Sequence, residues 1–167
     1  LHCSSAASDV YKRQELKELI QQRSSQERIL LALAGPPGSG KSTFASELES
    51  ALNQVLPEQA MILPMDGFNY DDLYLVPAGL RPRKGAPQTF EVGGFYHILR
   101  RLRERQEDFV AVPVFDRDLE IARAGARLIP AKIPVILVEG NYLLLQQEPW
   151  SQLRSLFDVA VLLEVPE

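Results

Sequence analysis

The stretch ALAGPPGSGKSTFASEL, residues 32–48, places glycines and prolines between an apolar run and a periodic segment. The run before the glycines is RILLALA, residues 28–34, and a short continuous apolar run is typical of a strand covered on both faces. After the glycines, Phe44, Leu48 and Leu52 recur at intervals of four, which is typical of a helix. The stretch therefore predicts a strand, a tight loop and a helix.

The loop carries a motif for binding phosphate. Gly35, Gly40, Lys41 and Ser42 fit the pattern GxxxxGK[ST], with the expected strand before it and helix after it. Glycines let successive backbone N–H groups point at phosphate oxygens, and the helix that begins near Lys41 directs its positive dipole end at the same anion. Lys41 adds a charge at the β- and γ-phosphates, and the Ser42 hydroxyl can hold Mg²⁺. The alternative is an ordinary Gly-rich turn with an N-cap serine.

We therefore predict a nucleotide site with ATP and Mg²⁺ as cofactors. The cofactor-binding residues expected from the motif are Gly35, Pro36, Pro37, Gly38, Ser39, Gly40, Lys41, Ser42 and Thr43.

Composition limits the other classes of function. The chain has 167 residues, 46% of them hydrophobic and 24% charged, as expected of one globular domain. The net charge of −4 does not indicate nucleic-acid binding, and no apolar run approaches the length of a membrane span. Cys3 is the single cysteine, so an internal disulfide is excluded and a reducing, cytoplasmic location is expected.

Residues 1–14, LHCSSAASDVYKRQ, lack an initial methionine, the apolar core of a signal peptide and any clear period. They resemble translated adaptor or vector sequence, and the alternative is a native disordered tail. A helix is expected from Gln14, where Leu16, Leu19 and Ile20 are spaced along one side. We expect the folded domain to comprise residues 15–167.

Apolar runs predict four more strands, interrupted by one further amphipathic helix that contains Phe95, Leu99 and Leu102. The expected strands lie at residues 60–65, 109–115, 134–138 and 158–165. Strands that alternate with helices favour an α/β fold with a mostly parallel sheet and helices on both faces. The Gly-, Pro- and Asp-rich segment 67–93 is longer than an ordinary connection, and long loops in compact domains are usually functional or disordered.

Two acidic residues follow predicted strands directly. Asp66 comes after MILPM and Glu139 after PVILV, and the carboxyl ends of parallel strands form the ligand-binding edge of such sheets. Glu139 is expected to support Mg²⁺, directly or through water. Asp66 is then a candidate general base, or a second carboxylate at the metal. Alternatively, either carboxylate only caps the next turn.

The motifs GPPGSGKST, MDGFNYDD, RKGAPQTFEVGGF, VPVFDRDLE and VEGNYLLL occur here in that order. In this respect the chain resembles kinases of the uridine kinase, phosphoribulokinase and pantothenate kinase group over residues 29–167. It looks most like the bacterial nucleoside or fructose kinase-like branch. The resemblance implies a three-layer P-loop NTPase sandwich and ATP-dependent phosphorylation of a small-molecule hydroxyl, with Asp66 at the family's base position and Glu139 at its acidic position.

The resemblance also implies contacts to the phosphate acceptor. Arg83 and Lys84, with Arg81 beside them, lie among prolines and glycines, and Asp116 and Arg117 follow a predicted strand. The alternative is that these are solvated surface charges. The acceptor class stays open among nucleosides, sugars and pantothenate-like alcohols, and the resemblance is compatible with a homodimer.

Members of the group continue beyond the strand VAVLLEVPE into a lid that carries arginines, whereas this sequence stops at Glu167. We therefore expect the kinase domain to be truncated at its C-terminus. Two other functions stay open: an NTPase that hydrolyses rather than transfers, and a non-catalytic fragment that only binds nucleotide. The GTPase motifs DxxG and NKxD do not occur, and a motor-type ATPase would prefer aspartate at position 139.

Overall fold

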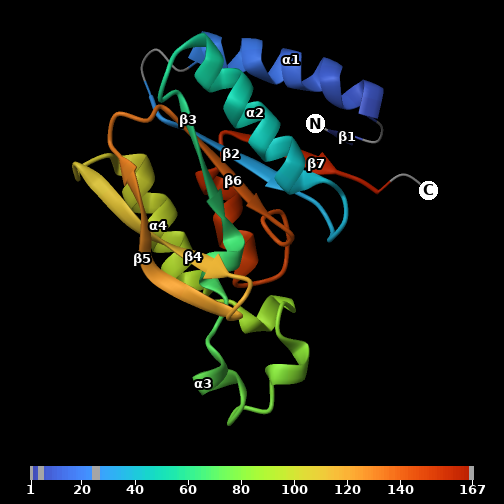
Figure 1. The fold of residues 1–167 in the computed structure, drawn as a ribbon, viewed down its shortest axis with the longest axis vertical. Helices are drawn as coiled ribbons and strands as arrows, with labels where there is room; N and C mark the ends of the chain where they lie inside the picture. Colours follow the sequence, from blue (N-terminus) through green and yellow to red (C-terminus); the bar gives the residue numbers. More distant parts are fainter. Residues whose placement is uncertain (1, 4–5, 24–26, 166–167) are drawn as a thin grey trace. The chain divides into compact units, whose positions relative to one another are not determined.

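A computed structural model describes residues 2–3, 6–23 and 27–165 of the chain. The chain divides into two compact units (Figure 1). The first comprises residues 1–63 and 132–167, and the second comprises residues 64–131.

The first unit is built on a five-stranded sheet in the order β1-β7-β2-β6-β3 (Figure 1). Its strands are β1 (His2–Cys3), β2 (Ile29–Ala34), β3 (Ala60–Pro64), β6 (Val135–Gly140) and β7 (Val159–Leu163). The central strand β2 is parallel to both β6 and β7, and β1 is parallel to β7. All residues of β2 are buried, as expected of a strand covered on both faces.

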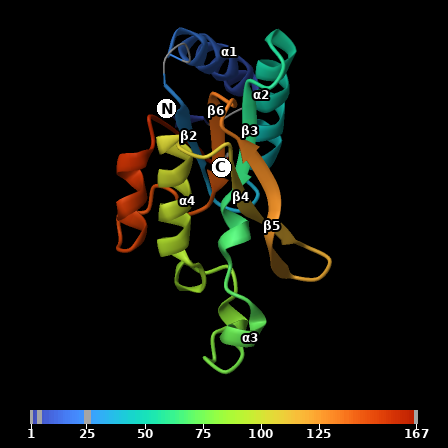
Figure 2. The same cartoon turned by 90° about the vertical axis from the view of Figure 1, so that its left-hand side faces the viewer.

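Two helices cover one face of this sheet, α1 (Ala6–Arg23) and α2 (Lys41–Val55) (Figure 2). Leu16 and Ile20 of α1 join Phe44, Leu48 and Leu52 of α2 in one buried cluster with alternate residues of the strands. The 3₁₀ helix η4 (Trp150–Leu156) buries Trp150, Leu153 and Leu156. The packing of α2 against the strands holds the start of α2 at the end of β2.

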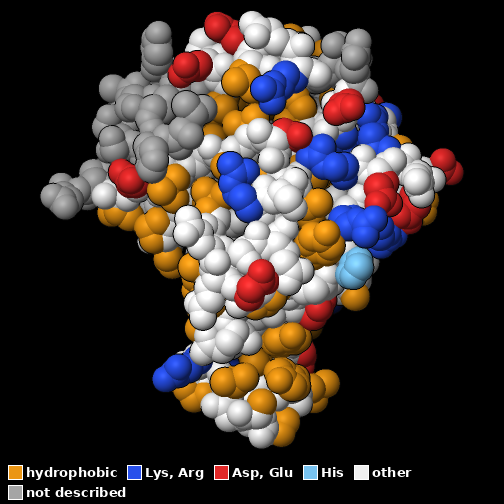
Figure 3. All heavy atoms as spheres, turned by 180° about the vertical axis from the view of Figure 1, so that it is seen from behind, with side chains coloured by type: hydrophobic (Ala, Val, Ile, Leu, Met, Phe, Trp, Pro, Cys, Tyr) orange, Lys and Arg blue, Asp and Glu red, His pale blue; other side chains and the backbone are white. Residues whose placement is uncertain are grey.

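The second unit contains a two-stranded antiparallel hairpin, β4 (Phe109–Asp116) and β5 (Ile121–Pro130), and the helix α4 (Val92–Glu104). The segment between β3 and α4 forms only short helices: η1 (Met65–Phe68), α3 (Asp72–Leu75), η2 (Arg81–Arg83) and η3 (Pro87–Thr89). Phe68 stacks on Phe95 of α4 at 4.4 Å between ring centroids. Leu73, Tyr74 and Val76 on and beside α3 are exposed, and apolar side chains gather over this segment in Figure 3.

The predicted α/β fold with a mostly parallel sheet is confirmed, and each predicted strand is present. The hairpin differs from the prediction, because β4 pairs with β5 outside the parallel sheet. Strand β5 was missed because IARAGARLIP contains charged and small residues and is largely exposed. Helix α1 begins at Ala6 rather than Gln14, although no period was evident there, and the origin of residues 1–14 stays a prediction.

Among the helices that the structure describes, none combines the length and apolarity needed to cross a membrane.

Candidate functional site

The loop between β2 and α2 has the backbone shape that the motif requires. Gly38 and Gly40 have φ angles of 80° and 78°, in the left-handed region that favours glycine. A Cβ atom on Gly35 would lie 2.6 Å from the backbone oxygen of Leu163 in β7. Glycine is thus required at Gly35 by close backbone approach and at the other two positions by conformation.

The N-terminus of α2 lacks the side-chain cap that the helices α3 and α4 possess. Its first intrahelical bond is donated by the Phe44 N–H to the Gly40 oxygen at 2.9 Å, so the amides before Phe44 precede the hydrogen-bond ladder. No side chain caps Gly40, whereas Asp71 caps α3 and Glu91 caps α4. An uncapped helix start combines free donors with a positive dipole end, which suits a phosphate group.

A hydroxyl inside the loop also lacks a partner. The Ser39 Oγ atom is buried and makes no hydrogen bond, and a buried polar atom without a partner is costly. The amides at the start of α2 are the donors available to a phosphate group, whereas the Ser39 hydroxyl is enclosed beside Gly35. The donor set is thus compatible with the predicted cofactor-binding residues, whose assignment stays a prediction.

Ser42 and Glu139 meet across the loop. The Ser42 Oγ donates a hydrogen bond to the Glu139 Oε1 at 2.9 Å. Glu139 is the penultimate residue of β6 and pairs with Leu33 of β2, so its carboxylate stands at the strand end that leads into the loop. The Lys41 Nζ donates to the Pro36 oxygen at 3.3 Å, a long bond that a bound anion can replace.

No group of three or more His, Cys, Asp or Glu side chains that could hold a metal occurs in the part of the chain that the structure describes. Mg²⁺ is commonly held by one or two protein oxygens together with substrate phosphates and water. The pair Ser42 and Glu139 fits that requirement, since both present oxygen atoms at one point.

Asp66 lies in η1, two residues after the end of β3, and β3 neighbours β6 in the sheet. Within the second unit, its carboxylate forms a 3.4 Å ion pair with Arg117, whose side chain is 80% exposed. The residues that follow, Gly67, Phe68 and Asn69, line a cavity of about 390 Å³. That volume lies within the range of small-molecule sites.

The remaining predicted acceptor contacts have different surroundings. Lys84 donates to the Asp72 carboxylate at 2.7 Å and to the Glu120 oxygen at 2.6 Å. Asp116 accepts from the Arg123 Nε at 2.7 Å, and this bond, with those from two turn amides, lowers the pKa of Asp116. Arg83 is exposed, with no ion pair recorded within the described residues. The roles of these residues toward an acceptor stay predictions.

Three partners in these contacts were missed by sequence reasoning: Asp72, Glu120 and Arg123. Because β5 was not recognised, no hairpin was expected, and the side chains around its turn had no predicted neighbours. The hydrogen bond from Lys84, supported by that from Arg81, lowers the pKa of Asp72.

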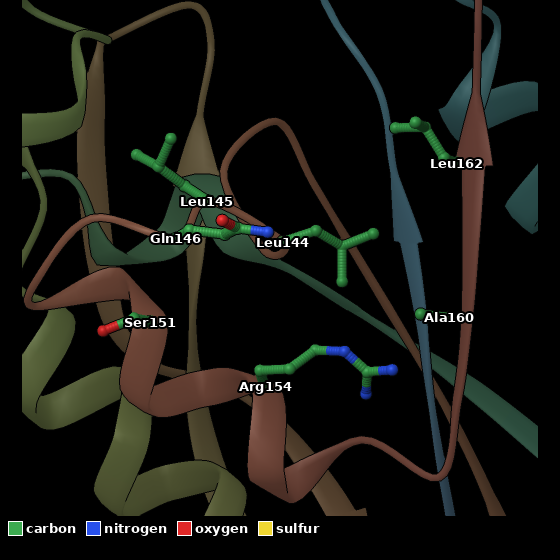
Figure 4. Close-up of a pocket in the computed structure, with 7 residues that line it drawn as sticks. All are labelled: Leu144, Leu145, Gln146, Ser151, Arg154, Ala160 and Leu162. Carbon is green, nitrogen blue, oxygen red and sulfur yellow. The ribbon is translucent and has the colours of Figure 1, made fainter.

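A second cavity, of about 470 Å³, lies in the first unit between residues 144–146, η4 and β7 (Figure 4). Ala160 and Leu162 line it, and they alternate along β7 with Val161 and Leu163 of the buried cluster. The Arg154 side chain extends toward β7 in Figure 4. No residue of the phosphate-binding loop lines this cavity, so it is not part of the predicted phosphate site.

Comparison with known proteins agrees with the phosphate-binding motif. The KAP family P-loop domain matches residues 12–74. A candidate uridine kinase of Schizosaccharomyces pombe is 34% identical over 165 residues, which cover 95% of this chain and 70% of that protein. The uncharacterized Escherichia coli protein YggC is 38% identical over 149 residues, covering 88% of this chain and 60% of YggC.

More distant similarity extends to the pantothenate kinase of Ligilactobacillus salivarius, 28% identical over 83% of this chain and 45% of that enzyme. Among solved structures, a candidate fructose transport system kinase from Silicibacter sp. TM1040 has a TM-score of 0.83 and 42% sequence identity. That match covers 92% of this chain and 75% of the Silicibacter chain.

The close approach at Gly35 generates a prediction. In Gly35→Ala the new methyl group meets the Leu163 backbone, so the loop must shift, at a cost of about 1–3 kcal/mol. We expect ATP affinity, measured by calorimetry, to fall by at least about tenfold as the amides leave their positions. Gly93→Ala in α4 is the control, since its Cβ would meet only the flexible Glu91 side chain. Equal ATP affinity in both variants would contradict the assigned loop geometry.

Proposed function

Since the chain belongs to the P-loop kinases of the uridine kinase and pantothenate kinase group, we propose that it transfers the γ-phosphate of ATP to a hydroxyl group of a small molecule. The observation that carries the proposal is the uncapped start of α2 beside the hydrogen-bonded pair Ser42 and Glu139. These groups supply anion donors and metal-binding oxygens at one place.

In this proposal the residues of the loop bind and orient the nucleotide. The amides at the start of α2 donate to phosphate oxygens, and Lys41 exchanges its long bond to Pro36 for the β- and γ-phosphates. Ser42 and Glu139 hold Mg²⁺, which when bound neutralises charge that develops on the transferred phosphoryl group.

Asp66 is proposed to accept the proton of the attacking hydroxyl. Its support is its place in the chain, two residues after the end of β3, a strand that neighbours the strand of Glu139, and its carboxylate is partly exposed. A general base must reach the hydroxyl proton in the reacting complex. Arg117, which pairs with this carboxylate, is proposed to orient it rather than to bind the acceptor directly.

The acceptor is proposed to be a nucleoside, a sugar or a pantothenate-like alcohol. The relatives' names include a uridine kinase, a fructose transport system kinase and a pantothenate kinase, and all three compounds are small alcohols. The cavity beside Gly67 and Asn69 has room for a compact molecule, and the buried Asn69 Oδ1 lacks a hydrogen-bond donor. An acceptor hydroxyl could supply that donor.

Replacing Lys41 tests the nucleotide site. We expect Lys41→Ala to abolish phosphoryl transfer and to weaken ATP binding, because the charge at the γ-phosphate is lost. The assay measures ADP release with uridine, D-fructose and pantothenate as separate acceptors, against a no-acceptor blank. Lys132→Ala, which removes an exposed lysine paired with Glu58 in the same unit, is the control. Unchanged ATP affinity and turnover in Lys41→Ala would refute the site, whereas ADP release independent of every acceptor would indicate hydrolysis.

Replacing Asp66 tests the base separately. Asp66→Asn keeps the size of the side chain but removes the proton acceptor, so transfer should fall by about 10²–10⁴-fold with little change in ATP affinity. Asp71→Asn is the matched control, because asparagine caps a helix about as well as aspartate does. If Asp66→Asn weakened ATP binding as much as it slowed transfer, Asp66 would be assigned to the metal or to the structure instead.

A further inference from the structure

Lys84 is a nearly buried lysine whose donors are already used. Its side chain is 9% exposed, and its ammonium group donates to the Asp72 Oδ1 at 2.7 Å and to the Glu120 backbone oxygen at 2.6 Å. The same nitrogen lies 5.8 Å from the centroid of the Phe115 ring. An ammonium group has three donors, and the aromatic face occupies its remaining side. Little capacity is left for a bound acceptor.

Arg81 joins the same two acids. Its Nε donates to the Asp72 Oδ2 at 2.7 Å, and a terminal nitrogen lies 2.5 Å from the Glu120 Oε2. Each oxygen of Asp72 therefore accepts from a different cation, and Glu120 is held through both its side chain and its backbone. We call Asp72, Arg81, Lys84 and Glu120 the strap. Single exposed ion pairs contribute little, but a connected set that includes a nearly buried lysine restricts its members together.

The strap joins the segment before α4 to the turn of the β4–β5 hairpin. Glu120 stands in that turn, residues 117–120, with a left-handed φ of 55°. The turn is also fixed from within, because the Asp116 Oδ1 accepts from the N–H groups of Asp118 and Leu119 at 3.1 Å. The position of the turn is thus set by the strap at Glu120 and by Asp116 within the hairpin.

Arg117 lies within this turn and reaches Asp66 at 3.4 Å. Its side chain is 80% exposed, so packing around the guanidinium does little to hold it, and the placement of its backbone decides whether it reaches the carboxylate. A displacement of the turn backbone would therefore change the distance between Arg117 and Asp66.

We propose that Lys84 and Arg81 are positioning residues, which hold the hairpin turn through Asp72 and Glu120 so that Arg117 can orient the Asp66 carboxylate. The inference rests on the proposed function, in which Asp66 is the base. It assigns Arg81 and Lys84 to the protein's own acids rather than to the acceptor. Lys84 then acts on the reaction only through Arg117.

Hydrogen exchange tests, without any phosphate acceptor present, whether Lys84 holds the hairpin turn. In Lys84→Met, which keeps an unbranched apolar side chain of similar length, amides of residues 117–120 should exchange about tenfold faster than in the wild type. Lys84→Arg retains the charge and should restore much of the protection. Arg100→Met removes an exposed cation paired with Glu104 on α4 and is the control. Unchanged exchange at residues 117–120 in Lys84→Met would overturn the proposal.

Kinetics test whether Lys84 acts on the reaction through Arg117, with whichever of uridine, D-fructose or pantothenate the wild type phosphorylates. Lys84→Met should lower kcat by about tenfold with KM for the acceptor nearly unchanged, and the double variant with Arg117→Met should be no slower than Arg117→Met alone. A raised KM with kcat retained, or losses that multiply in the double variant, would show that Lys84 acts on the acceptor directly. If the wild type phosphorylates none of the three, the proposed function fails for them, and hydrogen exchange alone decides whether the strap holds the turn.

Discussion

The backbone N–H groups at the start of α2 have no hydrogen-bond acceptors within the helix. The proposed chemistry of the chain depends on a phosphate group that accepts these hydrogen bonds. At α3 and α4 the protein caps the helix with its own carboxylates, those of Asp71 and Glu91. Here the loop instead uses glycines at left-handed φ, which keeps side chains away from the donors. The buried Ser39 hydroxyl inside the loop makes no hydrogen bond, which adds a polar cost.

The buried sheet anchors both ends of the phosphate-binding loop. Strand β2 is buried along its whole length between β6 and β7, and α2 packs Phe44, Leu48 and Leu52 into the cluster beside it. The loop is therefore anchored at both ends, and Gly35 approaches the backbone of β7 closely. Since Ser42 and Glu139 come from the helix and the neighbouring strand, their hydrogen bond follows from the same packing.

Sequence alone predicted the parts governed by local pattern and by parallel-sheet topology. The apolar runs located the strands, and the motif placed Ser42 near the acid that follows PVILV, as the Ser42–Glu139 bond shows. The hairpin was not predictable in the same way, because β5 is exposed and lacks an apolar alternation. Consequently the partners of Lys84 and Asp116 could not be foreseen, since ion pairs between distant segments leave no periodic signal.

The most direct test of this account is a ¹H–¹⁵N correlation spectrum of the chain, recorded with and without a magnesium complex of a non-hydrolysable ATP analogue. If the start of α2 binds the phosphates, the largest shifts should fall on the amides of Gly40, Lys41 and Ser42, which precede the first intrahelical bond. Saturable binding of the analogue that left these three amides unshifted would contradict it.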